Sequence, residues 1–398
     1  MADTSHQVVV AAAVLRTGCL LAARRRTPAR LAGAWELPGG KVEPGETDAA
    51  ALVRECREEL GAEIDVIERM EPAVTLESGW VLRGHVVRLA AGSSEPVPGA
   101  EHDAIRWLMP EELDDVAWLD ADRPLVDALR ERLLDGEPLP GGGVGGAVRI
   151  GPTVRRPAGP WTPTIAELLD HLRAHGVPCV PRPLGVDARG REVLSYIPGE
   201  TVAGGDGSVP GWARGDDVIG AVGRWLRRYH EAARSFRPAD PRWRLAGGDA
   251  EELAPDRVVC HNDIAPANIV VERDVTTGRV ELAGVLDWDV AGPGRAIDDL
   301  AFAAWNLVPL HAELAAVEAA RRLWVLAEAY GGIDPYELLA AVPVRLGTSI
   351  DRIQAGAARG DAGMRRLLAA GVVTRVETAR ARLTERLPQV DRALARES

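Results

Sequence analysis

Three glutamates in one short segment, Glu55, Glu58 and Glu59, have a spacing that places their carboxylates on one face of a helix. Like charges at these spacings repel one another, so a purely structural helix gains no stability from them. A bound Mg²⁺ or Mn²⁺ ion reverses the sign of this energy, because hard cations bind carboxylate oxygens. The spacing therefore indicates a divalent-metal site, with a solvated acidic helix face as the alternative.

The loop that precedes these glutamates is suited to phosphate binding. Gly39 and Gly40 permit unusual backbone angles and allow a phosphate chain to approach the backbone closely. Loop and helix together carry seven residues at fixed spacing, which are Gly40, Glu46, Arg54, Glu55, Glu58, Glu59 and Gly61. This pattern matches the Nudix box, and the chain resembles the Nudix family over about residues 6–134.

The resemblance looks closest to the MutT-like branch, which hydrolyses nucleoside triphosphates, because WELPGGKVEPGE is similar to the loop of that branch. It implies that Glu55, Glu58 and Glu59 hold the metal, and that one of them helps to activate the attacking water. It also implies that Gly39 and Gly40 lie at the nucleotide.

The same resemblance assigns roles to further residues. Arg54 is expected to pair with Glu46 and brace the loop against the helix, with a simple surface ion pair as the alternative. Outside the box, Glu101 resembles an additional metal ligand of this branch, and Arg24 stands where a phosphate-contacting arginine is expected. Asp122 stands where a base-contacting residue is expected. For each of these last three, an ordinary surface residue is the alternative.

A second group of polar residues lies in the C-terminal half. The segment 261–263 (HND), followed after four residues by Asn268, has the spacing of a kinase catalytic loop. Residues 269–273 and 279–286 are expected to form an antiparallel hairpin, which returns Asp287 to a place beside Asn268. Two oxygen-bearing side chains then converge where a magnesium-bound phosphate needs them. A hairpin with incidental polar caps is the alternative.

The segments HNDIAPANI, VLDWD and GPGRAIDDLA resemble the aminoglycoside-phosphotransferase-like kinases, and the resemblance covers about residues 140–395. It implies that ATP is the phosphate donor and that the acceptor is a hydroxyl of a small molecule. It also implies that Asp263 is the base and that Asn268 and Asp287 hold Mg²⁺. The resemblance also gives roles to residues outside this set. Asp289 is a further site candidate, Asp299 is expected to brace the catalytic loop, and His261 is expected to be structural. Ser195 and Ile197 are expected to form the hinge segment at the adenine.

The chain departs from this family at the lysine that binds the nucleotide phosphates. Lys41 is the only lysine in the sequence, and it belongs to the first group of residues. We expect Arg156 to take the place of the missing lysine, paired with Glu167 on the following helix. Arginine keeps the positive charge but not the compact geometry of a lysine.

These residues require a particular order of elements. The sequence has strand-like runs at 8–15, 18–23, 72–76 and 80–90, and helical segments at 47–60, 109–115 and 122–134. This order predicts an α/β/α sandwich over residues 1–136, which is the fold that the resemblance to the Nudix family implies. Strands at 147–150 and 152–156 are expected to begin a second domain, 137–398. This domain is expected to be a bilobal protein-kinase-like fold, with an N-lobe at about 140–198 and a mostly helical C-lobe at about 199–398. The predicted fold class is α/β and α+β in two domains.

The composition narrows the classes of function. A net charge of −12 argues against polymeric nucleic acid as a partner, because a phosphate backbone requires clustered positive charge. The N-terminus lacks a signal-peptide pattern, and no apolar run is long enough to span a membrane. The four cysteines lie far apart, which is typical of a reduced, cytoplasmic protein. We therefore expect nucleotides and a small hydroxyl compound as partners, and we infer no protein partner.

Three hypotheses follow from the two groups of residues. The first is a bifunctional, magnesium-dependent enzyme with a nucleotide hydrolase and a small-molecule kinase. The second is an active hydrolase joined to a pseudokinase, which the missing lysine favours and the retained Asp263, Asn268 and Asp287 oppose. The third is a nucleotide sensor without catalysis in either half, which the intact glutamate set opposes.

Overall fold

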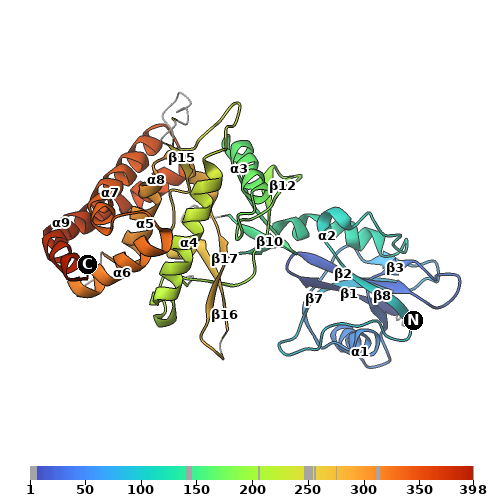
Figure 1. Cartoon of the computed structure of the whole chain (residues 1–398). Helices are drawn as coiled ribbons and strands as arrows, with labels where there is room; N and C mark the ends of the chain where they lie inside the picture. The colour runs from blue at the N-terminus through green and yellow to red at the C-terminus, as the bar shows by residue number, and fades with distance from the viewer. Residues whose placement is uncertain are drawn as a thin grey trace. The chain divides into compact units, whose positions relative to one another are not determined.

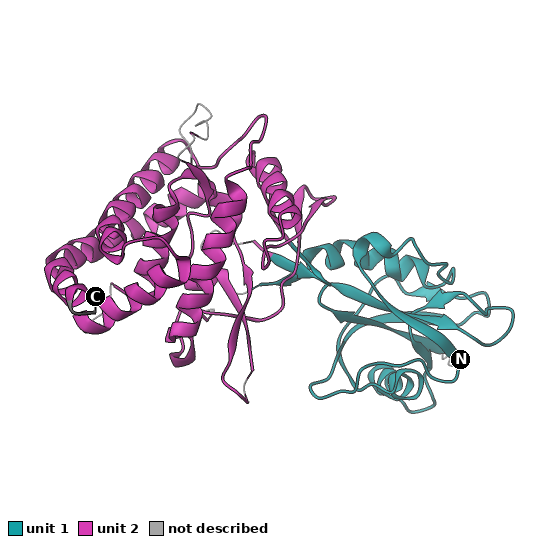
Figure 2. Cartoon of the chain, viewed as in Figure 1, with its two compact units in different colours: residues 1–139, 148–154 teal, residues 140–147, 155–398 magenta. Residues whose placement is uncertain are grey.

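The computed structural model describes residues 7–139, 146–204, 207–245, 254, 257–274, 276–310 and 314–397. The chain forms two compact units, the first comprising 1–139 and 148–154 and the second 140–147 and 155–398 (Figure 2). Residues 137–139 and 148–154 were expected in the second domain, whereas their contacts place them in the first unit. One reason is the hydrogen bond of 2.6 Å from the Gly151 amide to the Thr17 carbonyl.

The first unit contains a mixed sheet in the order β3-β2-β1-β7-β5, in which β4 also pairs with β1, β6 with β7, and β8 with β2. Only β1 and β7 run parallel among these pairs; the others are antiparallel. The strands are β1 (Val8–Arg16), β2 (Cys19–Arg25), β3 (Trp35–Glu36), β4 (Gly39–Lys41), β5 (Ile64–Arg69), β6 (Val74–Thr75), β7 (Val81–Leu89) and β8 (His102–Leu108).

Two helices cover opposite faces of this sheet, α1 (Asp48–Leu60) and α2 (Arg123–Asp135) (Figure 1). The alternation of β1 explains the arrangement, because successive side chains of a strand point to opposite faces. Val10, Ala12 and Val14 pack in the core beneath α1, whereas Ala11 and Ala13 pack in the core beneath α2. The first unit is thus an α/β/α sandwich.

The ends of α1 are set by local interactions. The Thr47 hydroxyl accepts a hydrogen bond from the Ala50 amide at 3.2 Å, and Gly61 ends the helix with a left-handed φ of 62°. Two other elements that the sequence predicted differ from the structure. The expected strand at 72–76 is reduced to β6, and the expected helical segment at 109–115 is a single 3₁₀ turn at Pro110–Glu112.

The second unit combines short strands with a helical C-terminal region. Its strand orders are β12-β13-β11, β14-β16-β17 and β15-β18, while β9 (Glu137–Pro138) pairs with β10 (Val148–Ile150) within the first unit. The strands are β11 (Thr153–Pro157), β12 (Pro183–Val186), β13 (Arg191–Ser195), β14 (Glu200–Thr201), β15 (Val258–Cys260), β16 (Ile269–Arg273), β17 (Val280–Val285) and β18 (Gly292–Gly294). The division between the units falls inside β11.

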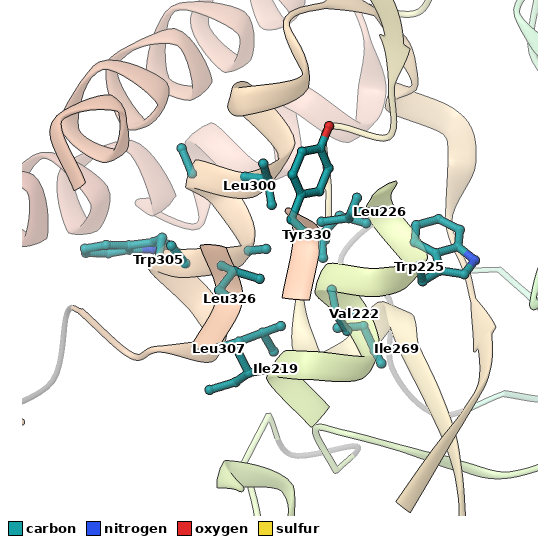
Figure 3. Packing of buried hydrophobic residues seen from close by; sticks show 14 of the residues in the cluster. Ile219, Val222, Trp225, Leu226, Ile269, Leu300, Trp305, Leu307, Leu326 and Tyr330 are labelled. Atoms are coloured by element: carbon teal, nitrogen blue, oxygen red, sulfur yellow. The ribbon is translucent and has the colours of Figure 1, made fainter. Parts of the chain in front are cut away.

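The C-terminal region is helical, as expected, and surrounds one large apolar core. The core joins Val222 of α4 to Leu300 of α5 and Leu326 of α6 (Figure 3). The helices are α3 (Thr162–Ala174), α4 (Asp216–Ala233), α5 (Ala296–Leu307), α6 (Ala316–Tyr330), α7 (Pro335–Ala358), α8 (Ala362–Ala369) and α9 (Val372–Glu397). Within the described residues, no helix is both long and apolar enough to cross a membrane.

Candidate active sites

In the first unit, the loop backbone lies directly against the glutamates of α1. The Gly39 amide donates a hydrogen bond to Glu59 Oε2 at 2.9 Å. A Cβ atom on Gly39 would lie 2.0 Å from the Val10 carbonyl oxygen, and a Cβ atom on Gly40 would lie 2.1 Å from Glu55 Oε1. Position 39 therefore requires glycine, whereas a side chain at position 40 would force the Glu55 carboxylate to move. Gly39 touches the backbone of β1, whereas Gly40 touches a site carboxylate.

Arg54 connects this loop to the helix. Its Nε and Nη2 donate to the two carboxylate oxygens of Glu46 at 3.2 and 3.1 Å, and its Nη1 donates to Glu55 Oε1 at 2.8 Å. The hydrogen bonds from Arg54 lower the pKa of Glu46. The third glutamate, Glu58, has a side chain that is 63% exposed and lies 3.9 Å from Arg54. The helix thus presents one braced, one exposed and one buried carboxylate.

The buried carboxylate of Glu59 has a perturbed ionisation. Burial raises its pKa to about 7, with smaller contributions in the same direction from Glu36 and Glu55. His102 and the Gly39 amide oppose this shift. A carboxylate with these neighbours lacks a full counter-charge, and a divalent cation would supply one. The oxygen donors of α1 therefore fit Mg²⁺ or Mn²⁺.

A polar cluster next to Glu59 was not predicted from the sequence. Glu36 accepts hydrogen bonds of 2.6 Å from Arg25 Nε, and its Oε1 lies 2.8 Å from His102 Nε2. Among the described residues, the Nδ1 atom of His102 is buried without a hydrogen-bond partner. A usable signal was present in the sequence, because Glu36 lies between Trp35 and the apolar Leu37. A charge buried between apolar residues requires a partner.

Two of the residues predicted outside the box lie at the edge of this cluster. Arg24 donates to Asp103 Oδ1 at 2.6 Å, and its side chain is 41% exposed. Its neighbour on β2 points to the other face of the strand, so Arg25 and not Arg24 reaches the buried cluster. Glu101 is exposed and lies 4.0 Å from Arg25 Nη2. No hydrogen bond or ion pair found in the described residues joins Glu101 to the glutamates of α1.

The third such residue, Asp122, is buried immediately before α2. It is only 5% exposed, which excludes an ordinary surface position. Burial raises its pKa to about 8, and Glu36 adds to the shift, while a backbone hydrogen bond at Leu37 and the charge of Arg25 oppose it. Asp122 therefore belongs to the same polar region as Glu36.

In the second unit, the hairpin of β16 and β17 brings Asn268 and Asp287 together. Ile269 pairs with Val285 in the antiparallel register, and the Leu286 amide donates to the Asn268 carbonyl at 2.8 Å. The next residue, Asp287, has a left-handed φ of 61°, which turns the chain out of the strand at this point. The two side chains thus begin at adjacent points of the hairpin.

Asp263 of the predicted catalytic loop (residues 261–268) lies beside Asn268. Asn268 Nδ2 donates to Asp263 Oδ2 at 2.8 Å. Burial raises the pKa of Asp263 to about 7, with the charge of Asp287 adding and the Asn268 hydrogen bond opposing. His261 accepts from the Asp263 amide at Nδ1 (3.2 Å), so its Nε2 carries the proton and donates to a backbone carbonyl at 3.0 Å. Burial lowers the pKa of His261, which agrees with a neutral, structural imidazole.

Asp299 of α5 binds the backbone of the predicted catalytic loop. Its carboxylate is fully buried and accepts hydrogen bonds from the amides of His261 and Asn262 at 2.8 and 2.7 Å, and from His230 Nε2 at 3.0 Å. Burial alone would raise its pKa, but the interactions with His230, His261 and Asn262 lower it overall. His230, Cys260 and Asp299 lie close enough to share a metal ion. Since the Asp299 oxygens are already bonded and the Cys260 thiol donates to a carbonyl, we interpret this group as structural.

Arg156 has different partners from those predicted. Its guanidinium contacts Glu192 of β13 and Asp289, and its Nη1 donates to Asp287 Oδ1 at 2.8 Å. The predicted partner, Glu167, is exposed on α3. The prediction of an Arg156–Glu167 pair is therefore wrong, because β13 and not α3 carries the acid that Arg156 reaches.

The predicted hinge residues are engaged within the protein. The Ser195 amide donates to the Arg182 carbonyl at 2.9 Å, and the Ser195 hydroxyl accepts from the Arg182 amide at 2.8 Å. A Cβ atom on Gly284 would lie 2.8 Å from Ile197, so Ile197 packs closely on β17. The Ser195 amide is thus already used, and an adenine at this segment requires other backbone groups.

Comparisons with known proteins match the two units separately. Residues 5–129 match the model of the NUDIX domain, and residues 240–338 match the model of the phosphotransferase enzyme family. The chain is 42% identical over 131 residues to a candidate 8-oxo-dGTP diphosphatase 2 of Mycobacterium tuberculosis, covering 32% of this chain and 91% of that protein. It is 40% identical over 120 residues to the CTP pyrophosphohydrolase of Escherichia coli, covering 30% of this chain and 88% of that protein.

A third relative matches a longer segment. The chain is 39% identical over 171 residues to the trifolitoxin immunity protein of Rhizobium leguminosarum bv. trifolii. The match covers 42% of this chain and 60% of that protein.

Proposed function

Because the chain belongs to the Nudix family through residues 5–129 and carries a phosphotransferase-family domain at residues 240–338, we propose that it is a bifunctional, magnesium-dependent enzyme. The first unit hydrolyses the phosphoanhydride of a nucleoside triphosphate or of another nucleoside diphosphate derivative. The second transfers the γ-phosphate of ATP to a hydroxyl group of a small molecule.

For the first unit, the observation that carries the proposal is the Gly39–Glu59 contact, which places a buried carboxylate at the loop backbone. Glu55, Glu58 and Glu59 would hold the cation, with Glu101 as a further ligand. A divalent cation bound there supplies positive charge that lowers the pKa of the attacking water. Arg54 keeps Glu55 oriented.

The nucleotide itself would lie between the loop and the polar cluster. The backbone of Gly39 and Gly40 would lie at the phosphates. Arg24 is exposed enough to reach a phosphate after leaving Asp103, and Asp122 would meet the base. From a triphosphate, water attack gives a nucleoside monophosphate and pyrophosphate. Two relatives that match this unit are named for nucleoside triphosphates, 8-oxo-dGTP in one case and CTP in the other. Their names support this class of substrate.

The test for the first unit is a panel of nucleoside triphosphates and nucleotide sugars with Mg²⁺, analysed by mass spectrometry. The wild-type chain is compared with Glu58→Gln, because Glu58 is exposed and its loss should leave the fold intact. Monophosphate and pyrophosphate that disappear in the variant support the proposal and identify the substrate. Hydrolysis that is unchanged in Glu58→Gln contradicts it.

For the second unit, the convergence of Asp263, Asn268 and Asp287 supports a kinase in a bilobal, protein-kinase-like arrangement. Asp263, whose pKa burial raises to about 7, would orient the acceptor hydroxyl and accept its proton. Asn268 and Asp287 would hold the Mg²⁺ that accompanies ATP. Arg156, next to Asp287, would meet the phosphates in place of a lysine.

A pseudokinase is the second candidate, and one observation favours it. Arg156 already donates to Asp287, so this carboxylate is in contact with a cation of the protein itself. The two candidates differ in turnover. When the chain is incubated with ATP, Mg²⁺ and a library of hydroxyl compounds, a kinase gives a phosphorylated product that Asp263→Asn abolishes, whereas a pseudokinase binds nucleotide and yields none.

A further inference from the structure

A series of ion pairs in the second unit links Arg156 to Asp361, and its four side chains are 5–16% exposed. Arg156 contacts Asp289, and the other oxygen of Asp289 accepts from Arg244 Nη1 at 2.9 Å. Arg244 in turn donates to both oxygens of Asp361, from Nε at 2.8 Å and from Nη2 at 3.0 Å. Neither Arg244 nor Asp361 belongs to the catalytic loop or to the hairpin, and neither was expected at a site from the sequence.

The guanidinium of Arg244 is held in a single orientation. Its side chain is 5% exposed, and each of its three nitrogens donates to a carboxylate. Its Cζ atom also lies 4.5 Å from the centre of the Trp161 ring. Asp361 is fixed as well, because it caps α8 by accepting from the Met364 amide at 2.9 Å. Because its guanidinium is planar and all three nitrogens are hydrogen-bonded, Arg244 holds Asp289 in a fixed position.

Asp289 transmits this support to Arg156. One of its oxygens binds Arg156 and the other binds Arg244, and its side chain is only 14% exposed. Glu192, with a side chain that is 6% exposed, holds Arg156 from another side. The third partner of Arg156, Asp287, is 39% exposed and is the proposed metal ligand. Glu192 and Asp289 can therefore keep Arg156 in place when Asp287 turns to a cation.

We propose that Arg244 is a positioning residue of the phosphotransferase site, acting through Asp289 to fix the guanidinium of Arg156 where the phosphates of a metal-bound nucleotide arrive. The inference rests on the proposed function of the second unit. It explains how a flexible arginine can replace a lysine at a phosphate site. Two rigid carboxylates restrict its side chain before the ligand binds, so little conformational entropy is lost on binding.

A binding experiment on the full-length chain tests this role without knowledge of the acceptor. All proteins carry Glu58→Gln, so that the first unit does not consume the nucleotide. The magnesium complex of adenylyl imidodiphosphate is titrated, and amide hydrogen exchange is followed in peptides that cover residues 155–159 and 285–290, all of which belong to the second unit. Signals from these peptides report the second unit alone. Thermal unfolding of each variant shows whether it is folded.

The variants separate positioning from simple anchoring of α8. Arg244→Gln and Asp289→Asn are each expected to raise the half-saturating nucleotide concentration at least about tenfold, because a charge-assisted bond that orients Arg156 is lost. The double variant should bind the nucleotide no more weakly than whichever single variant binds it more weakly. The reason is that both changes interrupt the same series of contacts from Arg244 through Asp289 to Arg156. Asp361→Asn should have a smaller effect. Arg242→Gln, a matched control at an exposed site near Asp240, should have none.

Other results would overturn the inference. If Arg244→Gln binds as tightly as the parent, Arg244 does not position Arg156. If it weakens binding only as much as Asp361→Asn does while Asp289→Asn is without effect, Arg244 anchors α8 and nothing more. If the parent itself shows no nucleotide-dependent protection in these peptides, the proposed function of the second unit fails, and the inference fails with it.

Discussion

Replacing Gly40 by alanine places a methyl group where the structure holds the Glu55 carboxylate. The new Cβ atom would lie 2.1 Å from Glu55 Oε1 and 2.4 Å from its Cδ. The carboxylate must therefore retreat by at least about 1 Å to reach an ordinary contact distance, and a displacement of that size at a reacting group can reduce the rate about 100-fold. Arg54 prevents an easy escape, because it holds Glu55 Oε1 at 2.8 Å while also binding Glu46.

The effect should fall on activity more than on stability. Gly40 does not have a left-handed φ, so alanine is compatible with its backbone, and the group that must move is the end of a side chain. We expect kcat/KM to fall about 100-fold or more for the best nucleoside triphosphate of the panel, with a small change in Tm. The assay is magnesium-dependent release of pyrophosphate, measured beside thermal unfolding.

Gly39→Ala is the matched control, because its Cβ atom would lie 2.0 Å from the backbone carbonyl of Val10 at a φ of 155°. No side-chain rotation relieves this clash, so β4 must separate from β1 and Tm should fall markedly. Two outcomes would refute the reasoning. Gly40→Ala could keep at least about half of the wild-type activity, or it could lose as much stability as Gly39→Ala does.

Three further predictions concern ionisation and support. Asp263→Asn should abolish phosphate transfer to any acceptor while leaving hydrolysis by the first unit unchanged, as product analysis would show; transfer that persists would exclude Asp263 as the base. Burial raises the folded pKa of Asp122 to about 8, above its unfolded value, so the stability that depends on its protonated form is complete below the unfolded pKa and is lost as the pH rises through 8. Asp122→Asn should therefore raise Tm by several degrees above pH 8 and change it little at pH 5, and an equal effect at both would contradict the shift. Asp299→Ala should lower the free energy of unfolding of the second unit by about 3–5 kcal/mol, because buried donors of His261, Asn262 and His230 lose their acceptor. Denaturant titration checks this value, and a loss below about 1 kcal/mol would argue against the role of Asp299 as a brace.

Several features of this protein could be predicted from local sequence, because short-range geometry determines them. The glutamates of α1 share a face as a direct result of their spacing, and Thr47 and Gly61 end the helix through contacts within one turn. The return of Asp287 to Asn268 follows from the antiparallel pairing of two consecutive strands. Each of these inferences involves residues that are near one another in the chain.

Strands with many charged residues were harder to recognise. β5 (IDVIER) and β8 (HDAIRWL) were not expected, because their charges interrupt the apolar alternation that identifies a strand. The segment at 109–115 resembled a helix in composition, yet Pro110 and its neighbours form a single turn. Pairing with β7 and β2, which lie elsewhere in the sequence, decides the conformation of the two strands.

Only the tertiary structure decided which distant charges meet. Arg24 and Arg25 are adjacent arginines, so the sequence alone does not show which of them is buried. Arg25 contacts Glu36, which also contacts His102, because its side chain lies on the face of β2 that meets them. Likewise, an acid on the next helix was an equally reasonable partner for Arg156 in the sequence, but folding brings Glu192 of β13 to it. The physical reason is the same in both cases. A charge that is buried must find its counter-charge among the side chains that packing brings near, and their distance along the chain does not enter that energy.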